Sequence, residues 1–163
     1  MTVSSDFDDR QAIIAIKDTL QSNLTDPREQ YTNAARTWVH TDKPLSSAAY
    51  PRIQVRKRGP TTTEIISPGK EFIEWRSVIL DIQFWTETPF KWKDANNLYY
   101  ADEEFVKYYL NQIWVKLKAA QSTLQSTYGI TGLKLLTDED PYIEPDTQLY
   151  TGIVSVRIWY FVK

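Results

Sequence analysis

Two segments in which apolar and polar side chains alternate constrain the fold of this chain most. In the segment 72–85, the even positions from 78 onward carry Val, Leu, Ile and Phe, whereas Asp81 and Gln83 fall between them. The segment 148–162 repeats this alternation almost to the end of the sequence. A period of two is typical of antiparallel strands that pack one face on a core and expose the other to water. The two segments therefore predict an antiparallel sheet. The first segment indicates one solvated face, whereas Trp159 and Phe161 on the second side of the last strand indicate that both faces of that strand are at least partly covered.

Two other segments repeat apolar residues at helical spacing. The segment 7–24 carries isoleucine and leucine on one side and ends at Asp26-Pro27, because the residue before a proline is pushed out of the helical region. The segment 102–127 carries a longer apolar stripe, has acidic residues in its first turn and precedes Gly129. The spacing predicts two amphipathic helices.

The other segments are shorter and less regular. Alternating residues at 53–55 predict a strand. Residues 57–60 interrupt this strand and residues 61–66 resume it, so we expect a projecting β-hairpin over 57–72. A short strand is expected at 133–136. The expected loops are 28–50, 86–100 and 138–146.

The order of these elements predicts one domain over 1–163 in the α+β class. Strands follow a helix, and a second helix precedes the final strands. This order favours a mostly antiparallel β-sheet with two helices packed on one face.

The chain carries few of the residues that catalysis uses. Cysteine is absent, which excludes disulfides, thiolate metal sites and cysteine nucleophiles, and His40 is the only histidine. The sequence has no glycine-rich phosphate loop, and we expect His40 to be a surface or loop-packing residue. We expect no catalytic, metal or cofactor site, and we interpret the chain as not an enzyme. A small hydrolase whose carboxylates converge only in the folded chain stays open.

Length and N-terminal composition bear on where the chain resides. Residues 1–10 are polar and acidic, without the basic start and apolar stretch of a signal peptide. No segment approaches the roughly 20 apolar residues of a membrane span. The expectation is a protein that is made and kept in a cytoplasm and has no membrane partner.

One basic patch stands out against a net charge of −2. It consists of Arg56, Lys57 and Arg58, with Arg52 and Lys70 nearby. Such charges can bind phosphates, but at the end of a strand they also protect a sheet edge from unwanted pairing. We favour an edge or interface role over a nucleic-acid-binding module that uses the strand 52–58, and the second interpretation stays open.

Aromatic residues are the most informative part of the composition. Six tryptophans and ten tyrosines exceed what one small core needs. Aromatic side chains are enriched at protein–protein interfaces, so those on faces or loops that the pattern assigns to the outside are interface candidates. These are Trp38, Trp75, Trp85, Trp92, Tyr99, Tyr100 and Trp159. The alternative is that long loops fold back and bury these rings, and the two interpretations are compatible.

The loop 138–146 is acidic. It carries Asp138, Glu139 and Asp140, followed by Glu144 and Asp146. The spacing does not match a calcium-binding EF-hand loop, because the central glycine is missing. A solvated loop is the simplest interpretation, and a face that meets a basic partner is the alternative.

The layout as a whole resembles the tail-terminator (tail-completion) proteins of tailed phages and related archaeal viruses. The resemblance rests on the order of an N-terminal amphipathic helix, the strand 51–55, the strand 78–85, a helix that opens with residues 102–104 and the final strand 150–159. It covers nearly the whole chain and rests on order and pattern rather than on fixed motifs, and it carries over no catalytic residue.

The resemblance implies a virion structural protein at the junction of tail and neck. Such a chain forms a homo-oligomeric ring, expected to be a hexamer, on the tail tube protein. The ring stops tail assembly and joins the tail to the head–tail connector. DNA passes through the ring without specific binding, and Asp138, Glu139 and Asp140 are then candidates for residues that face the lumen. A head–tail joining neck protein of similar fold is the alternative within this class.

Overall fold

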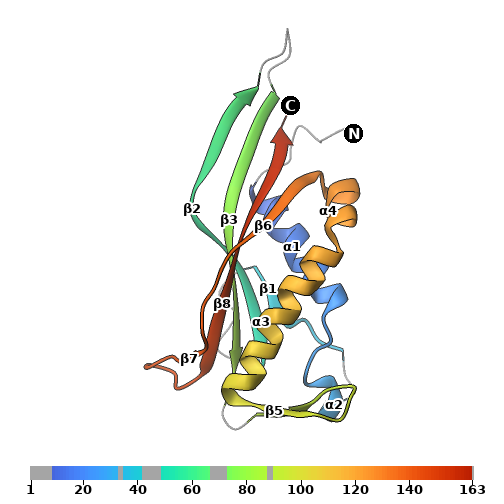
Figure 1. Ribbon diagram of the computed structural model, residues 1–163, viewed down its shortest axis with the longest axis vertical. Helices are drawn as coiled ribbons and strands as arrows, with labels where there is room; N and C mark the ends of the chain where they lie inside the picture. The colour runs from blue at the N-terminus through green and yellow to red at the C-terminus, as the bar shows by residue number, and fades with distance from the viewer. Residues whose placement is uncertain (1–8, 33–34, 42–48, 67–72, 88–89, 163) are drawn as a thin grey trace.

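One long, twisted sheet with a layer of helices on one side forms the fold (Figure 1). The structure is a computed structural model, and it describes residues 9–32, 35–41, 49–66, 73–87 and 90–162. Within these residues the main sheet has six strands in the order β1-β2-β3-β8-β6, with β7 paired to β8. The strands of this sheet are β1 (Val39–His40), β2 (Arg52–Ile66), β3 (Ile73–Thr86), β6 (Ile130–Asp138), β7 (Tyr142–Ile143) and β8 (Tyr150–Val162).

The three longest strands are central to the sheet. β3 pairs antiparallel with β2 on one side and with β8 on the other, and Val78 lies opposite Ile158 while Ile82 lies opposite Val154. β1 pairs with β2 in parallel, and the other pairings are antiparallel. The predicted α+β class and the mostly antiparallel sheet are therefore confirmed.

The described residues form four helices, α1 (Asp9–Asn23), α2 (Glu29–Thr32), α3 (Asp102–Ala119) and α4 (Gln121–Tyr128). Of these, α1, α3 and α4 cover one face of the sheet. α1 packs against β2, α3 against β8 and β3, and α4 against β6. The predicted second helix is thus present in two pieces, α3 and α4, which meet at Ala120. Gly129 ends α4 with a left-handed φ of 71°, which glycine adopts without steric cost.

The core lies between the helices and the sheet. β3 and β8 contribute the apolar side chains of their even positions, such as Leu80 and Val156, and the helices contribute Ile16 and Ile113, all of them fully buried. Gly152 lets α3 approach β8, because a Cβ atom there would lie 2.6 Å from a methyl carbon of Leu110.

The hairpin formed by β2 and β3 differs from the prediction in one respect. Residues 57–60 do not interrupt the strand, because β2 continues to Ile66 and absorbs the irregular segment as a register shift between Arg58 and Thr62. Gly59, with φ 70°, takes the left-handed conformation that such a bulge requires. The expected turn of the hairpin, residues 67–72, lies outside the described residues.

Three segments expected to be loops contain short elements. Part of 28–50 forms α2 and β1, although residues 33–34 and 42–48 are outside the described part of the chain. The segment 86–100 forms most of a two-stranded hairpin, β4 (Lys91–Lys93) and β5 (Tyr99–Ala101). The strand expected at 133–136 is longer than predicted and extends over all of β6, and the acidic loop contains β7.

Candidate protein interface on the second face of the sheet

The face of the sheet that turns away from the helices is formed by the odd positions of β3 and β8 and the even positions of β2 near its start. Along the sheet, Arg58 lies opposite Ile79, and Ile79 lies opposite Arg157. We call this the second face. The sequence predicts a solvated face here, and for its lower half that prediction is wrong: Asp81 and Gln83 are only 6% and 4% exposed.

A polar network buries Asp81. Ser155 donates a hydrogen bond to the carboxylate over 2.8 Å, and Arg58 Nε lies 3.0 Å from the same oxygen. Arg56 lies 3.9 Å from the other oxygen. The two arginine side chains stay about half exposed, so their stems cover Asp81 while their charged ends face water. This is why an aspartate on the outer side of a strand is buried.

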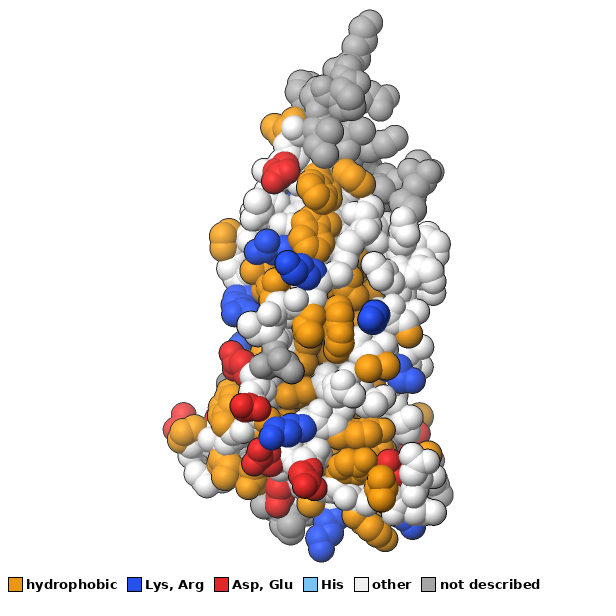
Figure 2. Space-filling view, in the orientation of Figure 1, with side chains coloured by type: hydrophobic (Ala, Val, Ile, Leu, Met, Phe, Trp, Pro, Cys, Tyr) orange, Lys and Arg blue, Asp and Glu red, His pale blue; other side chains and the backbone are white. Residues whose placement is uncertain are grey.

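The upper half of the second face carries stacked aromatic rings. Trp75 on β3 stacks on Phe161 and on Trp159 of β8, with ring centroids 6.2 and 6.5 Å apart. Trp159 also lies over Gly132 of β6, since a Cβ atom there would be 3.0 Å from its ring. All three rings remain partly exposed, and we call them the aromatic cluster. In the view of Figure 2, hydrophobic side chains form a column over the upper half of the molecule.

Basic side chains lie beside the aromatic cluster. Arg157 is two residues before Trp159 on β8, and Lys134 lies opposite Arg157 on β6. Within the described part of the chain, neither of these two cations makes an ion pair, in contrast to Arg56 and Arg58. The second face therefore presents apolar rings next to positive charge.

A protruding segment of opposite charge begins where β6 ends. Residues 139–149, which we call the acidic arm, contain four carboxylates and no lysine or arginine. The pairing of β7 with β8 holds the arm at the lower end of the sheet, where it projects to the side (Figure 1). Tyr142 and Ile143 in the arm are 41% and 46% exposed. The arm thus combines negative charge with exposed apolar surface.

Three of the predicted interface tryptophans are buried within the chain, so the prediction that they face outward is wrong. Trp38, Trp85 and Trp92 are 1%, 8% and 5% exposed. Trp38 packs edge-on against Tyr109, and Trp92 packs against the same ring, because the segments between helix and sheet fold back onto α3. For Trp38 and Trp92 the alternative, burial by folded-back segments, is confirmed, whereas Trp85 on β3 lies beneath the guanidinium of Arg52 from β2.

The other predicted residues lie in separate places. Trp75 and Trp159 belong to the aromatic cluster, whereas Tyr99 and Tyr100 lie on β5 at the far end of the molecule. Tyr99 is 69% exposed. Glu139 and Asp140 are exposed on the acidic arm, and the side chain of Asp138 lies outside the description. Phe161 is not among the predicted interface candidates, although the alternation along the last strand places it on the same face as Trp159.

The basic patch is divided between the two faces of the sheet. Lys57 points toward the helices and pairs with Asp9 over 2.5 Å, whereas Arg56 and Arg58 lie on the second face. Thr61 and Tyr160 also donate hydrogen bonds to Asp9. Burial by itself would raise the pKa of Asp9, but the hydrogen bonds from Lys57, Thr61 and Tyr160 outweigh it and lower this pKa. Lys57 therefore serves the attachment of α1.

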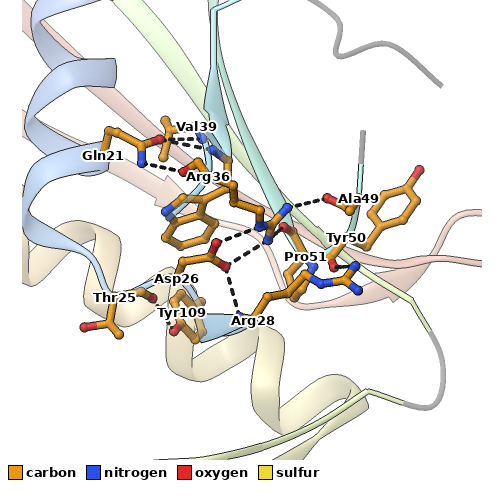
Figure 3. A network of polar contacts seen from close by, with 11 residues as sticks. Gln21, Thr25, Asp26, Arg28, Arg36, Val39, Ala49, Tyr50, Pro51 and Tyr109 are labelled. Carbon is orange, nitrogen blue, oxygen red and sulfur yellow. Dashed lines mark hydrogen bonds and ion pairs between the residues drawn. The ribbon is translucent and has the colours of Figure 1, made fainter. Parts of the chain in front are cut away.

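A second polar network fixes the segment between α1 and β2 (Figure 3). Asp26 is 2% exposed and accepts hydrogen bonds from Arg36 at 2.6 and 2.8 Å and from the backbone N–H of Arg28. Arg36 also donates to the carbonyl oxygens of Ala49 and Pro51. These contacts hold together a segment with little regular structure.

His40 lies next to this network, on β1. It is partly exposed and pairs with Gln54 in the sheet. Burial, together with the charges of Arg52 and Arg36, lowers the pKa of its imidazole. These features match the expected packing role.

Some negative findings concern the described residues alone. They contain no group of three or more His, Asp or Glu side chains placed to hold a metal ion. No helix among them is long and apolar enough to span a membrane.

An open hollow of about 400 Å³ between α3 and the acidic arm is lined by Glu139 and Asp140 together with Lys107.

Comparison with known proteins adds no relative. No protein-family model matches the chain, and no curated protein matches its sequence.

Proposed function

We propose that this chain is a non-catalytic virion structural protein that assembles with copies of itself into a ring. The ring sits at the end of a tail tube, terminates tail assembly and joins the tail to the head connector. The observation that carries the proposal is the aromatic cluster of Trp75, Trp159 and Phe161, which leaves stacked rings partly exposed on the second face. Aromatic side chains and arginine are enriched in protein interfaces.

The order of the elements supports the same proposal. The resemblance to tail terminators implies an N-terminal helix, a long hairpin, a long helix and a final strand. The fold has α1, the pair β2 and β3, α3 and β8 in this order. A head–tail joining neck protein of similar fold is the alternative within the class, because the same order suits both positions.

The arrangement of charges disfavours the nucleic-acid-binding module. Lys57 pairs with Asp9 on the helix side, and Arg58 and Arg56 share the carboxylate of Asp81. Phosphate binding by strand 52–58 would have to break these contacts or compete with them. A protein interface uses the half-exposed arginine ends without that cost.

Particle mass in solution tests the proposal. Light scattering coupled to size exclusion, on the chain alone and after mixing with assembled tail tubes, should give one closed oligomer or a ring capping each tube. A chain that stays monomeric and leaves the tubes uncapped would contradict it. Binding to DNA that is lost in Arg56→Ala/Arg58→Ala would favour the alternative module.

The lumen assignment belongs to this proposal as a separate step. If Asp138, Glu139 and Asp140 face the channel, their charge repels phosphate and lets the genome slide. Changing all three to the corresponding amides should then slow DNA ejection from assembled particles. Unchanged ejection would remove this role.

A further inference from the structure

We infer that the acidic arm of one copy docks on the aromatic cluster and the adjacent Lys134 and Arg157 of a second copy, so that the chains join head to tail. The inference rests on the proposed function, because it names the two surfaces through which the proposed ring would close. It commits to a second copy of this chain as the occupant of the second face.

The two surfaces are complementary in charge. Besides the lumen-facing candidates Glu139 and Asp140, the arm carries Glu144 and Asp146, and it has no basic residue. The upper second face carries Lys134 and Arg157, neither of which makes an ion pair within the described residues. In the view of Figure 2, Asp and Glu side chains gather over the lower half of the molecule. Opposite patches of this kind steer association and fix the orientation of two partners.

The two surfaces are also complementary in apolar area. Tyr142 and Ile143 are large side chains that the arm leaves 41% and 46% exposed. Trp75, Trp159 and Phe161 offer partly exposed ring faces. Apolar anchors that fit between aromatic rings supply most of the free energy of binding in protein interfaces.

The arm cannot make this contact within its own chain. β7 pairs with β8 at Thr151, which fixes Tyr142 there. Trp159 lies eight residues further along β8, at about 3.3 Å per residue, which is a separation of roughly 26 Å. An arm can therefore reach the aromatic cluster only on another copy.

Two different patches on one chain make a heterologous interface. Each copy offers its arm to one neighbour and its second face to the other, so the contact propagates until the rotation closes a ring. A ring closed in this way leaves neither patch unoccupied.

Charge reversal on each surface gives the test. The face variant is Lys134→Glu/Arg157→Glu, and the arm variant is Glu144→Lys/Asp146→Lys. Each alone brings like charges together and should raise the dissociation constant for self-association about a hundredfold. Mixed in equal amounts they should assemble again in alternation, because the unchanged arm meets the unchanged face and the basic arm meets the acidic face. Mass photometry and sedimentation velocity measure all four samples, including the unchanged chain.

Two controls complete the design. Lys91→Glu/Lys118→Glu changes the net charge as the face variant does but lies away from both surfaces, and it should assemble normally. Circular dichroism and thermal unfolding establish that each variant is folded. A further variant, Tyr142→Thr/Ile143→Thr, removes the apolar anchors of the arm and should weaken assembly. Threonine is chosen because it forms strands well, so β7 should be preserved.

The outcomes separate the two proposals. Loss of assembly in each variant with recovery in the mixture supports the docking of arm on face. If the unchanged chain assembles and both variants do so equally well, or if the mixture stays monomeric, the inference is wrong while ring assembly stands. An unchanged chain that assembles neither alone nor on tail tubes contradicts the proposed function, and the inference with it.

Discussion

Single residues matter most in this chain where a charge is buried beside its partner. Asp26 and Asp81 are buried and Asp9 is partly buried, and each lies among donors from distant parts of the sequence. Asp26 joins the end of α1 to the segment before β2, and Asp9 joins the start of α1 to β2 and β8. The loss of one such carboxylate leaves its donors unpaired, which costs more than the ion pair itself contributes.

Replacement of Asp26 by alanine should destabilise the protein by about 2–4 kcal/mol, because Arg36 would lose its carboxylate in a site with little access to water. Urea unfolding followed by tryptophan fluorescence measures the change. Asp18→Ala is the matched control, since its pair with Lys17 is much more accessible to water than the pair of Asp26 and should change the free energy of unfolding by less than about 0.5 kcal/mol. Equal effects of the two changes would contradict the role of Asp26.

Replacement of Asp9 by asparagine should have an effect that depends on pH. The pKa of Asp9 is lowered below its ordinary value of 3.8, so the charged form stabilises the folded state. This stabilisation is complete above the ordinary value and is lost as the pH falls through the folded-state pKa. The difference in unfolding free energy between the two proteins should therefore be constant from pH 7 to about pH 5 and shrink below about pH 4. A difference that stays constant down to pH 2 would contradict this assignment.

At the scale of elements, the close approach of α3 and β8 depends on Gly152. A Cβ atom at this position would lie 2.6 Å from Leu110 and 3.1 Å from Val106. Both neighbours are buried in the core, although Leu110 also borders the hollow between α3 and the acidic arm. A side chain at position 152 would therefore force Leu110 or the helix itself to move.

Gly152→Ala should accordingly cost about 1–3 kcal/mol of unfolding free energy through overpacking. In the double variant Gly152→Ala/Leu110→Ala the added methyl group would occupy part of the space left by the leucine. The loss of unfolding free energy in the double variant, measured by chemical denaturation, should be smaller than the sum of the losses in Gly152→Ala and Leu110→Ala by at least about 0.5 kcal/mol. Strictly additive costs would show that the contact does not limit the packing of α3.

The elements themselves could largely be predicted from the sequence. The period of two in β3 and β8 and the helical stripes of α1 and α3 depend on local side-chain patterns, which burial against one core enforces. The continuation of β2 through Gly59 and Pro60 could not be predicted, because a bulge is recognised only when the partner strand is known.

The candidate site could be predicted only in part. Trp75 and Trp159 were identified as outward-facing by alternation, and they meet in the aromatic cluster because β3 and β8 are neighbours in the sheet. The burial of Trp38, Trp85 and Trp92 depends on contacts between segments far apart in the sequence. The division of the basic patch follows from the alternation of side chains along a strand. This alternation places Lys57 on one face of the sheet and Arg56 and Arg58 on the other.

At the scale of the whole molecule, docking of arm on face restricts how a ring can be built. Rotation about the axis of a ring leaves the height of every point along that axis unchanged. The arm and the aromatic cluster of one copy must therefore lie at about the same height. Their separation along β8 then lies in the plane of the ring, and the long sheet should run around the ring rather than parallel to its axis.

Averaged electron micrographs test this orientation. A side view should show a ring whose thickness matches the short dimension of the chain rather than its long one. Rings with the sheets standing parallel to the axis would contradict the head-to-tail arrangement.

Chemical cross-linking tests the central claim most directly, because the chain has no cysteine of its own. A variant with Ile143→Cys in the arm and Thr62→Cys on the second face, treated with a short bis-maleimide, should give a ladder of covalent multimers that ends at one fixed number of chains. Either cysteine alone should give no ladder. A double variant that assembles but shows no more cross-linking than the single-cysteine controls would contradict the docking of arm on face.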